Sequence, residues 1–432
     1  MKQTLSIILF QFSVLVAFAQ PKVNNELKTL ITQSFSYFPK VKEVENIVAT
    51  AKDKVALTEL NKSPEVAYEA SYNYVKPKIE IPFPMGPNGS LVNFQFAPVN
   101  NVATDINASY ALFDFGRMKA TIQKSKDELQ YAQHNVDLIK NQLAAQVATV
   151  YYNIVFLKKA ISIEDSVLNF LNDNKVITES KLQNGDALKI DLLNIKATID
   201  AEQNKKVDLQ NSLQKQLNLL AYTTNTNQSS GTNFDFDINL TDTASALLSA
   251  QINNVEFLLA KDKIKQAKSD LSIAMLTDKP YIGVHAAAGV KNGYVPDVNA
   301  VQFNYIAGVS LSVPIYNGGK TKQQIKLQEH LIKQNELAVE SLNNNYKKDI
   351  AQAITDIRSN YERINNMKGQ IEQTIYAEQL AGTRYKDGVG TNLELTNAST
   401  NVERAELTKL QYEYQLCLAK LELAKIMGYQ YW

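Results

Sequence analysis

Apolar and small residues recur at steps of three and four through one long segment, residues 117–183. Such spacing places one apolar stripe on an α-helix and predicts that partner helices pack along its whole length. The segment contains no Pro or Gly and lies between Gly116 and Gly185. About 67 residues at 1.5 Å rise give a rod of roughly 100 Å, longer than a globular domain requires. The stripe consists of Met118, Ile122, Leu129, Ala132, Val136, Ile139, Leu143, Val147, Val150, Ile154, Leu157 and Ile161.

The same design occurs twice in the chain. Residues 111–117 (Ala-Leu-Phe-Asp-Phe-Gly-Arg) are matched by residues 314–320 (Pro-Ile-Tyr-Asn-Gly-Gly-Lys) about 203 positions later. Repeats of this size are duplicated structural halves and not short solenoid units. The same shift holds at the far end of the helix, where Gly185, Ile190, Asp191, Leu192 and Asn194 match Gly388, Leu393, Glu394, Leu395 and Asn397.

Four shorter segments alternate apolar and polar residues with the period of a β-strand: 65–75, 102–115, 281–290 and 303–313. Tyrosines along one apolar face are typical of a strand with a lipid-facing side, although a half-buried strand of a soluble sandwich has the same alternation. Residues 76–101 hold five prolines and predict an irregular loop. The residues expected to face lipid are Val66, Tyr68, Tyr72, Phe303, Tyr305 and Val309.

The order helix, strand pair and long helical hairpin therefore appears in each half. Single helices are predicted over 26–60 and 252–275, and return helices over 188–220 and 393–427. We expect a mainly α chain with transmembrane β-strands. The expected domains are a signal peptide (1–19), a first repeat (20–222, strand pair 65–115, hairpin 117–222), a linker (223–245) and a second repeat (246–432, strand pair 280–316, hairpin 320–428).

Composition and motifs narrow the function classes. Lysine plus arginine (45) nearly balances aspartate plus glutamate (44), so no nucleic-acid partner is expected. The single cysteine, Cys417, excludes an internal disulfide, and the three histidines show no metal-ligand spacing, so no metal or cofactor is expected. No nucleophile–base set or phosphate loop is visible, and an enzyme is the least favoured class.

The amino terminus has the pattern of a secretory signal peptide. Lys2 supplies a positive charge, residues 5–18 are apolar, and Ala17-Phe18-Ala19 is a small-x-small cleavage site. A first transmembrane helix is the weaker alternative, because the apolar run is short. No later segment reaches the 18 or more apolar residues of a spanning helix, so this chain can enter a membrane only as strands.

Four strands cannot close a barrel, and open sheet edges are not tolerated in lipid. Association is therefore required, and three chains would supply about twelve strands, within the range of known barrels. A twelve-stranded barrel continued by columns of helices would be a hollow conduit. A non-membrane periplasmic coiled-coil adaptor or structural protein is the alternative.

The junctions between strand and helix resemble those of the TolC-like outer membrane efflux family. The resemblance is carried by Leu112-Phe113-Asp114-Phe115-Gly116-Arg117, its copy at 314–320, and the motifs around Gly185 and Tyr385-x-x-Gly388. It extends over essentially the whole mature chain through the duplicated element order. It implies a homotrimer in the cell outer membrane that extends into the periplasm and acts as the exit duct of an efflux or type I secretion system. It also implies a periplasmic adaptor (membrane fusion) protein and an inner-membrane pump of RND, ABC or MFS type as partners.

The same resemblance suggests roles for the turns of the hairpins. The residues implied to dock the adaptor are Gly185, Asp186, Ala187, Tyr385, Gly388, Val389 and Gly390; a plain helix end is the alternative. The residues implied to line the pore gate are Asp191, Asn194, Glu394 and Asn397. Asn397 stands where the family has a second acidic residue, and Gly390 where it can carry an arginine. The alternative is that Asp191 and Glu394 are solvated carboxylates at helix starts, where the helix dipole favours them.

Overall fold

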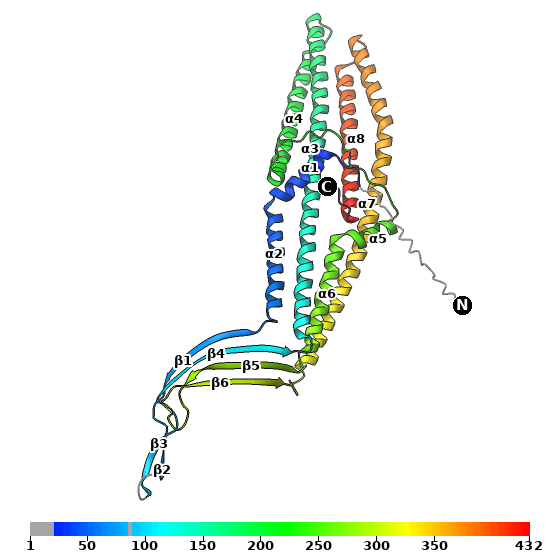
Figure 1. Cartoon of the computed structure of the whole chain (residues 1–432). Coiled ribbons are helices and arrows are strands. Elements are labelled where there is room, and N and C mark those ends of the chain that lie inside the picture. Colours follow the sequence, from blue (N-terminus) through cyan, green and yellow to red (C-terminus); the bar gives the residue numbers. More distant parts are fainter. Residues whose placement is uncertain (1–20, 85–88) are drawn as a thin grey trace, which may run out of the picture. The chain divides into compact units, whose positions relative to one another are not determined.

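The computed structural model describes residues 21–84 and 89–432 and divides into two compact units (Figure 1). The first unit comprises residues up to 44, with 135–258 and 340–432; the second comprises 45–134 and 259–339. The predicted signal peptide, residues 1–19, lies outside the described residues.

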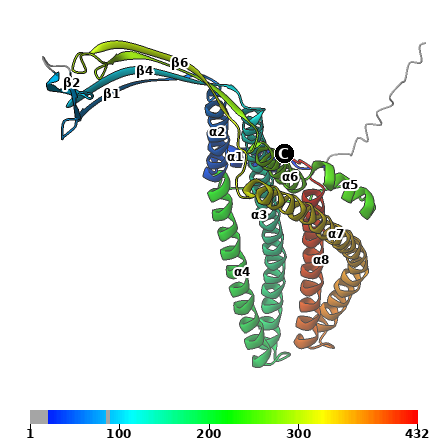
Figure 2. The ribbon, with the colours of Figure 1, turned by 90° about the horizontal axis from the view of Figure 1, so that it is seen from below.

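Both long helices are present with nearly the predicted bounds. Helix α3 has 68 residues and α7 has 67, and each is followed by a return helix of about half that length. Figures 1 and 2 show α3 beside α4 and α7 beside α8 as two hairpins. The bounds are Arg117–Asn184 for α3, Lys189–Thr224 for α4, Lys320–Lys386 for α7 and Asn392–Ile426 for α8.

The two single helices are each broken, which the apolar pattern did not show. The helix expected over 26–60 is α1 (Asn25–Tyr37) and α2 (Pro39–Leu60). Phe38 is extended, because a residue that precedes proline is excluded from the helical region. The helix expected over 252–275 is α5 (Thr243–Asn253) and α6 (Val255–Leu276).

The core of the first unit lies among α1, α3, α5, α7 and α8. Val147 and Ile154 of α3 and Ile350 and Ile357 of α7 are all fully buried there. Tyr152 is also fully buried, and its hydroxyl donates a hydrogen bond of 2.9 Å to Asp235. Burial, together with the neighbouring thiol and carboxylate, raises the pKa of Tyr152, so this hydroxyl remains a donor.

The second unit contains an antiparallel four-stranded sheet with the order β1-β4-β5-β6. β1 and β6 are its edges, and neither is paired on its outer side within the described residues. The strands are β1 (Glu65–Tyr74), β4 (Asn100–Phe113), β5 (Tyr281–Lys291) and β6 (Gln302–Ser312).

The loop predicted over residues 76–101 is wrong in part. β2 (Glu80–Pro84) and β3 (Leu91–Gln95) form a separate two-stranded antiparallel sheet. The prolines of this segment led to the prediction of a loop. Pro82 and Pro84 lie in an edge strand, where a missing backbone N–H is tolerated.

The first strand-to-helix junction explains the sequence motif at residues 112–117. Asp114 accepts hydrogen bonds from the backbone N–H groups of Gly116 (3.0 Å) and Met118 (2.5 Å), which caps the start of α3. Gly116 has a φ of +94°, which suits glycine. Arg117 donates to the carbonyl oxygens of Leu276, Thr277 and Lys279 at the end of α6.

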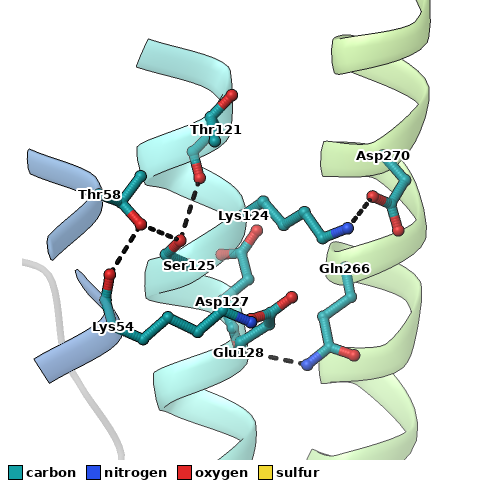
Figure 3. A network of polar contacts seen from close by, with 9 residues as sticks. All are labelled: Lys54, Thr58, Thr121, Lys124, Ser125, Asp127, Glu128, Gln266 and Asp270. Carbon is teal, nitrogen blue, oxygen red and sulfur yellow. Dashed lines mark hydrogen bonds and ion pairs between the residues drawn. The ribbon is translucent and has the colours of Figure 1, made fainter. Parts of the chain in front are cut away.

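A polar network joins α2, α3 and α6 within the second unit (Figure 3). Lys54 of α2 pairs with Glu128 of α3 at 2.6 Å, and Lys124 of α3 pairs with Asp270 of α6 at 2.6 Å. The network therefore ties both neighbouring helices to α3.

Among the described residues, none of the helices combines the length and the apolar character needed to cross a membrane.

Candidate functional site

One face of the four-stranded sheet is apolar and exposed. The strand register places Tyr68 opposite Ile106, Ile106 opposite Ala288, and Ala288 opposite Tyr305. Residues directly opposite on neighbouring strands share a face, so this row is continuous across the sheet. The six predicted lipid-facing residues all lie on this face and are between 63% and 78% exposed: Val66, Tyr68, Tyr72, Phe303, Tyr305 and Val309.

The opposite face of the sheet is polar. Glu69 lies opposite Asp105, and Lys291 lies opposite Gln302. Like charges in directly opposite positions repel each other, so the Glu69–Asp105 pair is suited to a wet surface. The sheet is therefore sharply two-sided, as a strand array between lipid and water requires.

Both long hairpins turn at a glycine in the left-handed region. Gly185 has a φ of +84° and Gly388 a φ of +78°. After each glycine, the backbone N–H bonds to the carbonyl oxygen five residues earlier: Asp186 to Lys181 (2.8 Å) and Val389 to Arg384 (3.0 Å). This is the Schellman end of a helix, formed identically in both halves.

The residues predicted to dock an adaptor are not equally accessible. Val389 is 69% exposed and Asp186 is exposed, but Ala187 is half-buried. Tyr385 is buried, and its hydroxyl lies 2.7 Å from the hydroxyl of Thr178 on α3. Tyr385 therefore holds α7 against α3 and is not itself a contact surface.

Gly390 is required by close packing. A Cβ atom there would lie 2.9 Å from the Cβ of Arg384 and 3.1 Å from the backbone nitrogen of Tyr385. Any side chain at this position would force the turn to shift.

The four predicted gate residues lie on the first two turns of the return helices. Asp191 accepts a hydrogen bond of 3.1 Å from the backbone N–H of Leu188 and so caps α4. Glu394 is half exposed and lies 3.7 Å from the guanidinium of Arg384. Asn194 and Asn397 are exposed. Each acidic residue shares a helix face with the asparagine three positions on.

Sequence reasoning missed Arg384 and the buried polar links between the hairpins. Arg384 is the charged partner of Glu394, and it lies on α7, before the turn. Asn174 of α3 donates to Asn392 of α8 at 2.9 Å, and both side chains are buried. The partners in the links between the hairpins, Asn174 with Asn392 and Thr178 with Tyr385, are more than 200 positions apart, so no local pattern indicates them. Arg384 and Glu394 are close in the sequence but lie on opposite sides of the turn.

Paired long hairpins, duplicated in one chain and joined to a two-sided sheet, define the subunit of an outer-membrane channel. The sequence model of the family "Outer membrane efflux protein" matches residues 30–226 and 246–429. The chain belongs to this family. The predicted family is thus confirmed, and the mainly helical fold with few strands is that of its members.

Individual proteins show the same relationship. Cation efflux system protein CusC of Escherichia coli O6:H1 is 20% identical over 415 residues, which cover 94% of this chain and 86% of CusC. Toxin and drug export protein A of Aggregatibacter actinomycetemcomitans is 24% identical over 339 residues, which cover 73% of this chain and 70% of that protein. The crystal structure of VceC from Vibrio cholerae has the same fold, with a TM-score of 0.77, 18% identity and coverage of 94% of this chain and 97% of VceC.

The chain is an outer-membrane exit channel for efflux or secretion. Family membership sets aside the alternative of a non-membrane periplasmic adaptor.

Proposed function

We propose that three copies of this chain form one channel, in which three four-stranded sheets close a barrel of about twelve strands in the outer membrane. The observation that carries the proposal is the apolar face of a sheet whose edges, β1 and β6, are both open. An open edge in lipid leaves backbone N–H and C=O groups without partners, at several kcal/mol per group. Pairing β1 of one copy with β6 of the next removes every edge.

The apolar face is then the lipid-facing side and the polar face lines the water-filled interior. Export through the signal peptide, with cleavage near Ala19, would deliver the chain to the periplasm before insertion. The helical hairpins would extend into the periplasm as a second barrel.

The strand faces provide the experiment. A charge at the bilayer midplane costs about 2–4 kcal/mol for arginine, so Tyr305→Arg and Val309→Arg should each remove most of the heat-resistant trimer from the outer-membrane fraction. Ser310→Arg is the matched control, because Ser310 pairs with Gly283 on the polar face of the same strand. Equal tolerance of arginine on both faces would refute the barrel assignment.

The hairpin turns are the proposed docking surface for a periplasmic adaptor, which in turn connects to an inner-membrane pump of RND, ABC or MFS type. Support comes from the exposed Val389 and Asp186 on matching Schellman turns, and from relatives named for cation efflux and for toxin and drug export. Gly185, Ala187, Gly388 and Gly390 shape the two turns, and Tyr385 fixes their position from inside the helix pair.

The pore gate is proposed at Asp191, Asn194, Glu394 and Asn397. Threefold symmetry would repeat each side chain as a ring around the pore. The contact between Glu394 and Arg384 (3.7 Å) gives this end of the hairpin an ionic pair within one subunit. The hydrogen bond of Asp191 to its own helix start also supports the simpler role of a cap.

A further inference from the structure

Three carboxylates from three different helices converge in the first unit. They belong to Glu164 of α3, Glu202 of α4 and Glu403 of α8, and one oxygen of each lies within 4.8 Å of the other two. Their side chains are 0%, 20% and 9% exposed, respectively. The expectation of no metal rested on the spacing of histidine and cysteine alone. These three glutamates lie on different helices, so no spacing in the sequence indicates them.

A positive charge already lies among them. The ammonium of Lys205 is 3.1 Å from Glu164 and 3.3 Å from Glu202, and it contacts Glu403 more closely. One ammonium against three ionised carboxylates would leave an excess of negative charge, which is costly away from water. Burial, together with the neighbouring Glu202, accordingly raises the pKa of the Glu164 carboxyl in spite of Lys205.

Glu164 is the member whose presence the fold does not explain. Its side chain is completely buried, and its Oε1 has no hydrogen-bond partner among the described residues. A buried carboxylate oxygen without a partner costs free energy unless an ion or a proton completes its surroundings. The matching position in the second half of the duplication, 203 residues on, is Met367, which is buried and apolar. An apolar residue therefore fits this level of the helix, and the carboxylate serves something other than packing.

We propose that Glu164, Glu202 and Glu403 bind a hard divalent cation, with Ca²⁺ as the best fit, at the position that the ammonium of Lys205 occupies. Ligand oxygens on opposite sides of Ca²⁺ at 2.3–2.6 Å are about 4.6–5.2 Å apart, which matches the convergence of the three carboxylates. Two positive charges balance the group better than one. The side chain of Lys205 is 38% exposed, so it can turn outward to solvent when the cation enters. This inference does not depend on the trimer or on any partner.

Isothermal titration calorimetry of the mature chain in detergent, after treatment with a chelator, tests the site. CaCl₂, MnCl₂ and MgCl₂ are titrated separately. We expect one site per chain, weakened about tenfold or more in Glu164→Gln and in Glu403→Gln, because each removes an anionic ligand. Lys205→Gln should tighten binding about tenfold, because it removes the competing charge.

Asp165→Asn is the matched control, because Asp165 is the next residue along α3 and pairs at the surface with Lys206. It should leave the affinity unchanged, as should the combination of Asp191→Asn with Glu394→Gln at the hairpin ends. Circular dichroism establishes that each variant is folded, and Lys205→Gln keeps the test decisive if Glu164→Gln does not fold. Absence of binding in both the wild type and Lys205→Gln would overturn the site. Equal weakening by Asp165→Asn and Glu164→Gln would also overturn it, since it would reveal only a diffuse charge effect.

Discussion

The two long helices, α3 and α7, are duplicated helices whose buried residues are alike and whose outward-facing residues differ. Positions that match by the shift of 203 residues are equally buried in the core: Val147 with Ile350, and Ile154 with Ile357. Apolar side chains are retained there because a packed core tolerates little change of volume or polarity.

Outward positions of the same two helices have diverged. Lys124 and Glu128 of α3 form ion pairs with α6 and α2, as Figure 3 shows. Their counterparts on α7 are Leu327 and Leu331, which lie one turn apart and are 53% and 38% exposed. The chain itself supplies charged partners for α3 at these positions, whereas α7 exposes two leucines there, which the proposed trimer would cover with a second copy.

Replacing the two exposed leucines of α7 with the charged residues at the matching positions of α3 tests this difference most directly. The double variant Leu327→Lys, Leu331→Glu should prevent trimer formation, because burying two charged side chains in an apolar interface removes their hydration, and their mutual attraction one turn apart offsets this only in part. Trimer is measured by unheated gel electrophoresis and by light scattering in detergent. Lys322→Gln with Lys326→Gln, on another face of α7, serves as the control. Normal trimers in the double variant would mean that this face of α7 meets no partner.

The core positions should respond alike in both helices. Ile154→Ala and Ile357→Ala should each lower the free energy of unfolding by about 2–5 kcal/mol, since each leaves a cavity at a fully buried site. Urea unfolding followed by circular dichroism measures the change. Leu331→Ala is the comparison and should cost much less in the isolated chain. A large difference between Ile154→Ala and Ile357→Ala would show that the two halves do not share one packing scheme.

The two hairpin turns differ in the exposure of their side chains, so we expect bulky substitutions at the two turns to affect export to different degrees. Val389→Trp should abolish export while trimers persist, because Val389 is 69% exposed; Ala187→Trp should act more weakly from its half-buried position. Intracellular accumulation of a fluorescent efflux substrate measures export in the native host. Val207→Trp, at an exposed site along α4, is the control. Full export by Val389→Trp would argue against docking at this turn.

The acidic residues just beyond the turns sharpen the comparison further. Glu394→Gln should reduce cation selectivity and weaken block by trivalent cations in single-channel recordings, because carboxylate rings in a narrow pore favour cations. Asp191→Asn should change less, since Asp191 is engaged in capping α4. Arg384→Gln should act in the opposite direction by releasing Glu394. If selectivity and block are unchanged when Glu394→Gln and Asp191→Asn are combined, both residues are solvated carboxylates at helix starts and do not line the pore.

The smallest expected effect concerns Lys420 of α8, whose counterpart on α4 is Leu217. The ammonium of Lys420 donates to Asp237 at 2.7 Å, and this hydrogen bond lowers the pKa of Asp237. Burial alone would lower the pKa of Lys420, but contacts with Asp237 and Tyr361 outweigh it and raise the pKa. Because the folded pKa of Asp237 lies below the unfolded value of about 3.9, the stabilisation is complete above that value and is lost as pH falls through the folded pKa.

Asp237→Asn should therefore lower the free energy of unfolding at pH 7 by less than about 1 kcal/mol, because the carboxylate is 61% exposed and screened by water. Urea unfolding at pH 7 and at an acidic pH below the folded pKa of Asp237 should show the variant and wild type converging in acid, where Asp237 is protonated in both the folded and the unfolded state. A constant difference between them at both pH values would contradict the assignment.

Periodicity in the sequence was sufficient for the long helices, the four main strands and the six exposed apolar residues on one sheet face. These features are local, because a step of 3.6 or 2 residues sets which side chains share a face. The duplication was also visible, because it preserves the same local motifs. The break at Phe38 and the β2–β3 hairpin were not found, since proline signals a helix start or an edge strand as readily as a loop. The break at Asn254 has no proline beside it; Asn254 is extended there and its side chain accepts from the backbone N–H of Glu256 at the start of α6.

Only the tertiary structure decided which distant side chains meet. The strand order β1-β4-β5-β6, the contact between Thr178 and Tyr385, and the convergence of Glu164, Glu202 and Glu403 all join segments far apart in the chain. Such contacts depend on how whole helices and strands pack, and packing is determined by the combined fit of many side chains. The sequence by itself determined the elements and their inner faces; the packing of those elements determined the polar links, the buried carboxylates and the apolar surface that α7 leaves exposed.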